Sequence, residues 1–343
     1  MPWYYIVIGI LGLAVLMIVH ESGHLIAARA FGMRVIKFSI GFGPALFRWQ
    51  PRGSETVYQV ALIPFLAYVQ IAGMNPLEEV DPDDKSSYAN ASLIGRITAI
   101  FAGPLANYLF ASVFFFAAFM IIGQQVWTHK IEVMPNTPAQ AAKLRDGDKV
   151  IAIDGMPIEN FEQMREVIIK SPNKPLAIEI ERDGKRSTIS VKPEPKSERG
   201  GGQIGVKPVM DMVPRAPGAA LKASIIEPAN VVKQLVVGLA RIVTLKDKAQ
   251  FTGPVGIVRE VGKAAERSWG EYLYLLGLLS AYLGGFNLVP FPALDGGRLL
   301  FLGYEAVTRR RPNARVEAHV HAVGLLMLLA LIAVVSVWDI KGN

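Results

Sequence analysis

The sequence predicts a polytopic α-helical membrane protein with four transmembrane helices, a membrane-associated β-hairpin region and one extracytoplasmic α+β domain. Composition is the first observation behind this class. Of the 343 residues, 51% are hydrophobic and only 19% are charged, and the mean hydropathy is +0.32. Such a chain is too apolar for an ordinary soluble protein. The second observation is the alternation of long apolar segments with one polar section, residues 129–208.

The formal net charge of +7 raises the question of a nucleic-acid partner. However, the Lys and Arg residues cluster beside apolar segments, as they do in the cytosolic loops of membrane proteins, so we expect no nucleic acid. The chain has no cysteine, which excludes disulfides, thiolate metal sites and cysteine nucleophiles. The first apolar segment lacks a basic start and a small-residue cleavage site, so we expect it to be retained rather than removed as a signal peptide.

The first predicted element, residues 1–31, is a transmembrane helix that carries a His-Glu-x-x-His motif. Trp3 to Val19 contains no charged residue, and the motif follows directly. On a helix, His20 and His24 lie on one face with Cβ atoms about 5–6 Å apart, as two zinc ligands require. Glu21 can then reach a zinc-bound water as a general base. The motif also occurs by chance with hydrogen-bonded histidines. Burying three ionisable groups in a membrane helix costs roughly a few kcal/mol each, which favours the functional interpretation.

Residues 32–92 are predicted to form a membrane-associated β-hairpin region followed by a cytosolic loop. Short apolar strands at Val35–Ile40, Thr56–Val60 and Tyr68–Ile71 are separated by Gly and Pro residues. We expect a hairpin sheet that dips into the protein from the cytosolic side, and the alternative is a small separate hairpin domain. The acidic run between Asn75 and Ser92 predicts a solvated loop.

Residues 93–123 are predicted to form the second transmembrane helix. It contains Gly103-Pro104, which permits a kink or a close approach to another helix. Asn107 is the amide side chain of this span. It contacts the metal site or makes a helix–helix hydrogen bond, and the residues alone leave both interpretations open.

The polar domain is predicted at residues 124–210. Its Leu144–Ile158 run reads as a turn, an alternating strand and a glycine turn, and Asp183-Gly184 joins two further strands as a hairpin. This pattern resembles a PDZ domain of the bacterial protease-associated kind, which binds an extended peptide at a sheet edge. A domain that keeps the fold without a peptide partner is equally compatible with the sequence. Residues 211–271 are predicted to be an extracytoplasmic linker with amphipathic helices.

Residues 272–343 are predicted to hold the third and fourth transmembrane helices, at about 272–290 and 319–338. Between them lies Leu294-Asp295-Gly296-Gly297, where Pro290 and Pro292 break the span. Zinc requires a third protein ligand and an open position. Asp295 is the best candidate because irregular backbone can line a polar cavity, although the same residues also suit an ordinary turn. The other candidates are Glu305, His319 and His321, and the two histidines are expected to face the headgroup region.

Basic residues follow the first and third spans, which predicts the orientation of the chain. Arg29, Arg34 and Lys37 follow the first span, and Arg309 to Arg311 follow the third. The positive-inside rule then places both regions in the cytosol. We therefore expect both termini and the PDZ-like domain outside the cytoplasm, with the active site near the cytosolic side.

Several motifs occur together and in order along the chain: His20-Glu21-Ser22-Gly23-His24, the Phe38–Pro44 run, Gly103–Asn107, the PDZ-like run and Asn287–Gly297. Together they resemble the bacterial site-2 protease family, the RseP-like intramembrane zinc metalloproteases of M50 type. The resemblance covers nearly the whole chain. It implies that His20, His24 and Asp295 bind Zn²⁺ and that Glu21 is the catalytic base. It also implies a multi-pass protein of the bacterial cytoplasmic membrane.

The resemblance further implies the substrates and partners. These are single-pass membrane proteins surrounded by membrane lipids, such as anti-sigma factors already cleaved outside by another protease, or signal-peptide remnants. The hairpin region would present a strand to them, and we expect substrate contacts from Asn107, Asn287, Val35, Tyr68 and Val69. Two features depart from the family. The chain has room for one PDZ-like domain where many members have two, and Tyr282 stands where relatives often have Asn.

Three other functions are alternatives to intramembrane proteolysis. A membrane-anchored metalloprotease acting on soluble peptides is disfavoured by the charge-free stretch before His20. A membrane scaffold that recruits partners through the PDZ-like domain, with a structural or vestigial metal site, is distinguished by its zinc content. A metal transporter needs more polar groups along its spans than the second and fourth segments provide.

Overall fold

The computed structural model describes residues 2–158, 161–195, 201–244 and 253–341. Contacts divide the chain into two compact units, of which the helical unit comprises residues 1–122 and 216–343 and the β unit comprises residues 123–215. The helical unit contains α1 (Trp3–Ala30), β1 (Val35–Trp49), β2 (Val57–Ile71), a short 3₁₀ helix (Tyr88–Asn90), α2 (Leu93–Ile122), α5 (Pro217–Val243), α6 (Pro254–Arg267), α7 (Trp269–Asn287), α8 (Asp295–Thr308) and α9 (Ala314–Lys341).

Within the described residues, four helices are long and apolar enough to cross a membrane: α1, α2, α5 and α9. The number of spans agrees with the prediction, but the third candidate differs. The sequence predicts the third span at 272–290 and an amphipathic helix from Pro217. In the structure α7 is a 19-residue helix that packs against α1, α2, α5 and α6. By length and hydropathy α5 is a candidate span, since its 27 residues exceed the roughly 20 that a bilayer requires, and the span at 272–290 stays a prediction.

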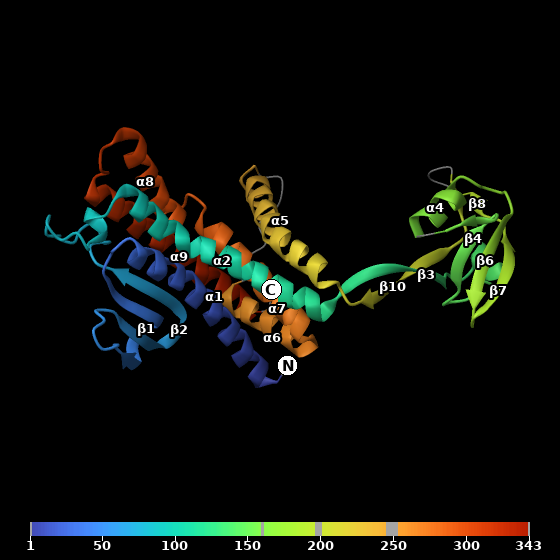
Figure 1. Ribbon diagram of the computed structural model, residues 1–343, viewed down its shortest axis with the longest axis horizontal. Coiled ribbons are helices and arrows are strands. Elements are labelled where there is room, and N and C mark those ends of the chain that lie inside the picture. The colour runs from blue at the N-terminus through green and yellow to red at the C-terminus, as the bar shows by residue number, and fades with distance from the viewer. Residues whose placement is uncertain (1, 159–160, 196–200, 245–252, 342–343) are drawn as a thin grey trace. The chain divides into compact units, whose positions relative to one another are not determined.

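Small residues bring α1, α2 and α7 close together in the helical unit (Figure 1). A Cβ on Gly23 of α1 would overlap the carbonyl of Ala102 in α2, and a Cβ on Gly284 of α7 would lie 2.7 Å from the carbonyl oxygen of Pro104. Helices that lack these side chains can approach with their backbones nearly in contact, as in other membrane bundles. This packing fixes the motif-bearing half of α1 against α2.

The β1–β2 pair is a curled sheet rather than a simple hairpin. Phe38 pairs with both Val69 and Tyr58, and Ser39 pairs with both Tyr68 and Gln59. The first half of β1 is therefore a central strand, with the end of β2 on one side and the beginning of β2 on the other. Gly41 and Gly43 take φ of +94° and +92°, which a residue with a side chain rarely adopts, and let β1 bend there. The sheet belongs to the helical unit, so the alternative of a separate hairpin domain is wrong.

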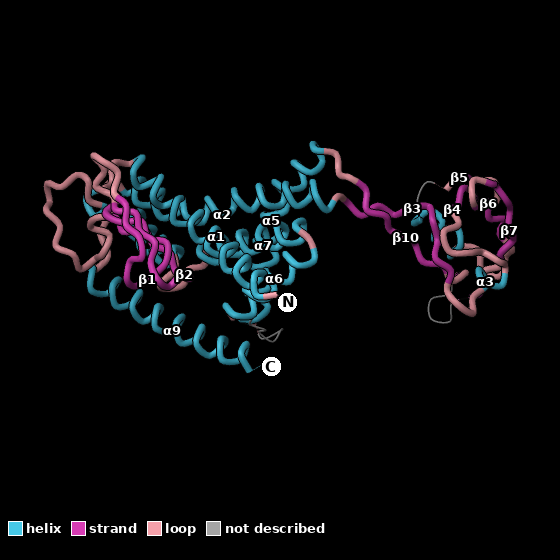
Figure 2. The backbone as a smooth tube through the Cα atoms, turned by 90° about the horizontal axis from the view of Figure 1, so that it is seen from below, coloured by secondary structure: helices cyan, strands magenta, loops and turns pink. Residues whose placement is uncertain are grey.

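α9 is held near its C-terminal end and at His321 and Gly324, which contact the loop before α8, and most of its other residues are exposed. Figure 2 shows it along one side of the helical unit, away from α2 and α7. The Asp339 carboxylate accepts hydrogen bonds from the backbone N–H groups of Gly253 (3.1 Å) and Gly256 (2.8 Å) at the start of α6. A carboxylate in this position satisfies helix N–H groups that have no partner within the helix and interacts favourably with the helix dipole.

The β unit contains β3 (Gln124–Val133), α3 (Pro138–Ala141), β4 (Lys149–Ile153), β5 (Met156–Pro157), α4 (Phe161–Ile169), β6 (Leu176–Arg182), β7 (Lys185–Val191), β8 (Glu194–Pro195), β9 (Gly202–Gln203) and β10 (Val206–Val213). Its main sheet has the order β10-β3-β4-β6-β7, and β5 pairs with β4. The predicted hairpin joins β6 and β7, with φ of +52° at Asp183 and +73° at Gly184. The unit has a hydrophobic core of its own.

One buried ion pair lies at the edge of that core. Asp148 is 1% exposed and accepts hydrogen bonds from Nε and Nη2 of Arg182, both at 2.7 Å, and from the backbone N–H of Arg145. Burial alone raises the pKa of the Asp148 carboxyl, but these donors outweigh it and hold the pKa below its usual value. The carboxylate is therefore charged at neutral pH and fully hydrogen-bonded.

Candidate metal centre

The histidines of the motif point to the same side of α1, and both rings are buried. His20 and His24 are each 6% exposed, and Glu21 is 9% exposed. One helical turn separates the two histidines, so their rings meet at a centroid distance of 4.8 Å. Gly103 of α2 faces the His24 ring, and a Cβ at that position would overlap it. The absence of a side chain at Gly103, where the sequence predicts a close approach of helices, therefore makes room for the His24 ring.

The hydrogen bond of His24 fixes which of its nitrogens is free. Its Nδ1 lies 2.7 Å from the carbonyl oxygen of Ala99 on α2. A carbonyl only accepts, so Nδ1 carries the proton and Nε2 presents a lone pair to the centre. Metal-binding histidines commonly use one ring N–H in this way, which also orients the ring.

Asn107 orients the His20 ring as the Ala99 carbonyl orients the His24 ring. Its side-chain amide lies 3.2 Å from Nδ1 of His20, and the residue is fully buried. Its Oδ1 is buried without a hydrogen-bond partner when Nδ2 faces the ring. The amide is satisfied when Oδ1 faces the ring instead and accepts a hydrogen bond from Nδ1–H of His20. In that arrangement Nε2 of His20 also presents a lone pair to the centre.

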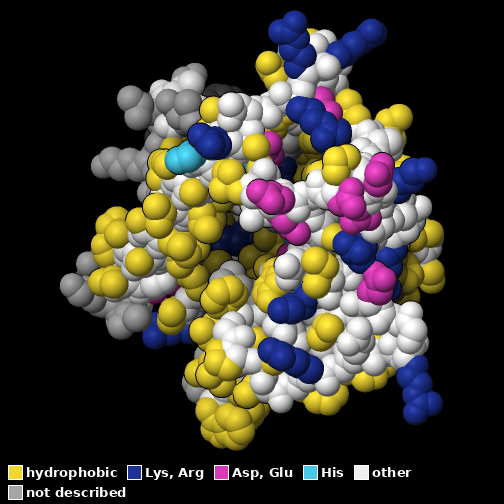
Figure 3. Space-filling model, turned by 90° about the vertical axis from the view of Figure 1, so that its left-hand side faces the viewer, with side chains coloured by type: hydrophobic (Ala, Val, Ile, Leu, Met, Phe, Trp, Pro, Cys, Tyr) yellow, Lys and Arg dark blue, Asp and Glu magenta, His cyan; other side chains and the backbone are white. Residues whose placement is uncertain are grey.

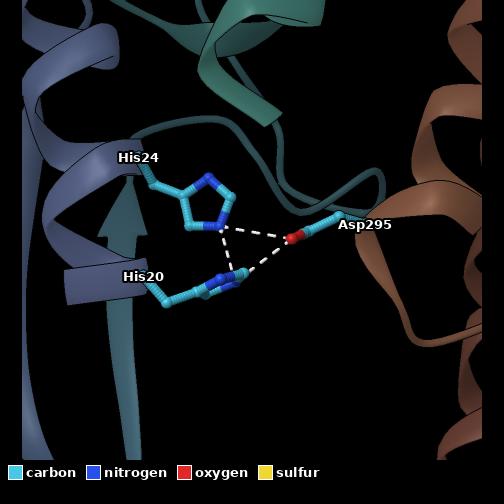
Figure 4. Close-up of side chains that lie close together, drawn as sticks. All are labelled: His20, His24 and Asp295. Carbon is cyan, nitrogen blue, oxygen red and sulfur yellow. Dashed lines mark hydrogen bonds and ion pairs between the residues drawn. The ribbon is translucent and has the colours of Figure 1, made fainter. Parts of the chain in front are cut away.

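Asp295 completes the group from the first residue of α8 (Figure 4). Its Oδ2 lies 3.2 Å from Nε2 of His20 and 3.4 Å from Nε2 of His24, and the two Nε2 atoms are 3.2 Å apart. This carboxylate oxygen is buried and has no hydrogen-bond donor among the residues that the structure describes. Three lone-pair atoms facing one another repel unless something positive lies between them. A proton relieves one contact at a time, whereas a divalent cation relieves all three.

The donor set fits zinc. The ligand atoms of His20, His24 and Asp295 all lie within 4.8 Å of one another, and they form the one such group among the described residues. Two imidazoles and one carboxylate are nitrogen and oxygen donors that zinc accepts, and three protein ligands leave a fourth position for water or substrate. The chain has no cysteine that could supply a softer donor.

The other candidates for the third ligand are occupied elsewhere. The Glu305 carboxylate pairs with Arg96, whose Nη1 lies 2.9 Å from Oε2 of Glu305. His319 is exposed and bonds the Arg315 carbonyl of its own helix at 2.6 Å. His321 accepts a hydrogen bond from the backbone N–H of Ala293 at 3.0 Å. The prediction that His321 faces the headgroup region is therefore wrong, because its ring turns inward against the loop before Asp295.

Comparison with known proteins identifies the family. The model of peptidase family M50 matches residues 8–331. The chain belongs to peptidase family M50. The zinc metalloprotease RasP of Geobacillus kaustophilus is 31% identical over 400 residues and covers 94% of each chain. A protein of Clostridium perfringens, named as a predicted zinc metalloprotease, is 33% identical over 339 residues and covers 98% of each chain.

The chain is thus an M50 zinc metalloprotease of the site-2 protease type and an integral membrane protein. A solved PDZ domain of an SdrC-like protein from Listeria innocua also matches, at 23% identity. It covers 24% of this chain and 93% of that chain with a TM-score of 0.22, which is too low to establish the fold of the β unit.

In this M50 peptidase, Glu21 lies between the metal-type ligands and the edge of the sheet. Its Oε2 accepts a hydrogen bond of 2.9 Å from the backbone N–H of Val69 in β2. That N–H points away from β1, so the end of β2 is an open sheet edge on this side. The contact joins the motif on α1 to the strand that the sequence predicts to meet the substrate.

The residues predicted to contact substrate differ in exposure: some line a cleft and others are buried. Tyr68 and Val69 line a cleft of about 590 Å³ beside Arg298 and Glu317. Figure 3 shows this end of the protein hollowed, with acidic side chains near the rim and basic ones deeper. Val35 is 2% exposed on the central strand, so its side chain lies in the core rather than at the open edge. Asn287 is half-buried at the C-terminal end of α7.

Substitution of Gly103 by Ala tests the packing behind His24. The added methyl group would overlap the imidazole, so His24 must turn away from the Ala99 carbonyl. We expect the purified variant to lose zinc affinity by at least the roughly 10- to 100-fold typical of disturbed ligand orientation. Chelator competition measures the affinity. The matched control is Gly238→Ala on α5, where a Cβ meets nothing within 4 Å. Equal zinc affinities in the two variants would contradict the assigned contact.

Proposed function

We propose that the protein is an intramembrane protease that hydrolyses peptide bonds in the transmembrane segments of single-pass membrane proteins. The observation that carries the proposal is the buried group of His20, His24 and Asp295, in which three lone-pair atoms converge without a donor. The group is built on α1, the first of the four candidate spans among the described residues. We assign these three residues as the zinc ligands and Glu21 as the general base.

Bound zinc would polarise the scissile carbonyl and lower the pKa of its water towards 7. The residues of the chain perform the remaining tasks. The Ala99 carbonyl and the Asn107 amide hold the two imidazoles with Nε2 directed into the centre. The Glu21 carboxylate accepts the proton of the attacking water and delivers it to the leaving amine. Its hydrogen bond from the Val69 N–H keeps the carboxylate beside the sheet edge.

The open edge of β2 supplies a way to bind an unwound substrate. A transmembrane helix satisfies its own backbone, so its peptide bonds are inaccessible until it unwinds. Strand addition beside Tyr68 and Val69 would satisfy the released N–H and C=O groups and place the chain next to Glu21. Asn287 remains a proposed substrate contact at the end of α7. For Asn107 the contact with His20 favours orientation of a ligand over contact with substrate. The burial of Val35 favours a packing role for that residue.

The β unit and the membrane orientation belong to the same proposal. The β unit has its own core and a sheet flanked by α3 and α4, which suits a PDZ-like domain that binds a peptide or filters substrates by size. Basic residues after α1 and after α8 favour a cytosolic position for the nearby metal centre in a bacterial cytoplasmic membrane, with the β unit and both termini outside. Anti-sigma factors trimmed by another protease and signal-peptide remnants are the proposed substrate classes.

Reconstitution in liposomes with a single-pass model substrate tests the proposal. We expect cleavage within the transmembrane segment, its loss after treatment with a zinc chelator, and its return on addition of zinc. A substrate whose transmembrane segment is made entirely of leucine should be cleaved more slowly than one containing Gly or Pro, since it resists unwinding. Cleavage confined to soluble peptides, or cleavage that survives complete removal of zinc, would contradict the proposal.

A further inference from the structure

The loop between α7 and α8 holds Asp295 through an unusual backbone conformation. Ala293, two residues before Asp295, has φ of +73°, which lies in the left-handed region that residues other than glycine seldom adopt. Such a conformation persists when surrounding contacts determine it. The loop also folds back so tightly that a Cβ on Gly296 would overlap the carbonyl of Val289. The position of the Asp295 carboxylate therefore depends on what holds this loop.

Two neighbouring residues on α9 hold it. The backbone N–H of Ala293 donates a 3.0 Å hydrogen bond to Nδ1 of His321. One turn later, Gly324 lies so close to the loop that a Cβ there would overlap Pro292. His321 and Gly324 lie on the same face of α9 because they are three residues apart. This face of α9 thus contacts the two residues immediately before the Leu294-Asp295 pair.

The His321 ring is placed for this one contact. Since Nδ1 accepts from Ala293, the proton of the neutral ring is on Nε2. That Nε2 is buried and has no hydrogen-bond partner among the described residues. Phe301 of α8 packs beside the ring at a centroid distance of 5.6 Å. A buried donor without a partner is unfavourable. The hydrogen bond that Nδ1 accepts from Ala293 is the contact that offsets this unfavourable burial of Nε2.

We propose that His321 is a positioning residue for the metal centre, which sets the Asp295 carboxylate against His20 and His24 by accepting the Ala293 N–H. The inference rests on the proposed function in one respect, namely that Asp295 is a zinc ligand. His321 itself lies outside the set of ligands. Loss of the Nδ1 acceptor leaves the Ala293 N–H unpaired and releases the strained backbone, so Asp295 no longer meets the two imidazoles.

Asn and Gln substitutions at position 321 separate this role from general packing. The Oδ1 atom of Asn occupies nearly the place of Nδ1 in His, whereas the Oε1 atom of Gln reaches to the place of Nε2. We expect His321→Gln and His321→Leu to weaken zinc binding about 10- to 100-fold, as loss of an outer-shell partner does. His321→Asn should stay within a few-fold of the parent. The measurement is the zinc dissociation constant of the purified full-length protein by chelator competition, together with the metal-to-protein ratio.

Matched controls are available on the same elements. His319→Asn and His319→Gln change an exposed histidine of α9 that bonds only its own helix, so their zinc affinities should equal that of the parent. Gly324→Ala should push the loop away from α9 and weaken zinc binding as His321→Gln does. Gly303→Ala on α8 should not, because a Cβ there meets nothing within 4 Å.

The outcomes distinguish this inference from the proposed function. Equal losses in His321→Asn and His321→Gln would overturn it, since packing alone would then explain the effect. Unchanged zinc affinity in His321→Gln and His321→Leu would also overturn it. If Asp295→Ala retains the zinc affinity of the parent, the ligand assignment itself fails. If Asp295→Ala loses zinc while His321→Gln does not, only the role of His321 fails.

Discussion

Replacing Glu21 by Gln is expected to abolish cleavage of a transmembrane substrate while the protein keeps its zinc. Gln has nearly the same shape, and its side-chain oxygen can still accept the hydrogen bond from Val69. It cannot accept the proton of the attacking water. Loss of a general base lowers the rate by roughly 10²- to 10⁴-fold. The measurement is the cleavage rate in liposomes together with the zinc content of the same preparation.

The control for Glu21 is Glu79→Gln, because Glu79 is an exposed carboxylate of the acidic loop. This control should retain both zinc and activity. Cleavage by Glu21→Gln at the parental rate would exclude Glu21 as the base. Loss of zinc along with activity would instead indicate that Glu21 helps to hold the metal, and the division of roles within the motif would need revision.

Asp295→Ala is expected to lose bound zinc and, as a consequence, all proteolytic activity. The change leaves two ligands, His20 and His24, where a catalytic zinc site requires three. The loss of affinity should exceed the roughly 10- to 100-fold that follows removal of an outer-shell partner. Zinc content after dialysis and the dissociation constant by chelator competition both measure it. The variant should still fold, because Oδ2 of Asp295 accepts no hydrogen bond from the described part of the chain.

Asp83→Ala removes an exposed carboxylate and serves as the control, with zinc and activity expected at parental levels. Full zinc occupancy in Asp295→Ala would show that the two histidines recruit another ligand. If the protein is instead a membrane scaffold that recruits partners through the β unit, a different zinc content is expected. A vestigial site would be zinc-free in the parent protein as well, and partner binding at the β unit would be independent of Asp295.

Local patterns predicted most of the secondary structure around the site. The helix through His20 and His24 follows from an unbroken apolar run, and the β6–β7 hairpin follows from Asp183-Gly184. The assignment of spans near the C-terminal third stays a prediction. The charged residues of α5 suggested a surface helix, whereas its length and mean hydropathy make it a candidate span. The apolar composition of α7 predicts a span, and in the structure α7 runs antiparallel along α2, with Gly270 against Ile122 and Gly284 against Pro104.

The sequence by itself determined that His20, Glu21 and His24 lie together, because the period of a helix brings residues four apart onto one face. It also determined that the chain breaks at Pro290 and Pro292 before Asp295, whereas the structure places Asp295 itself as the first residue of α8. Only the tertiary structure decided which distant carboxylate meets the histidines, since Asp295 and Glu305 both carry a carboxylate and differ in the partners that folding gives them. The same holds for the orienting contacts of Ala99 and Asn107 and for His321. Long-range contacts depend on how helices pack, and no local period encodes them.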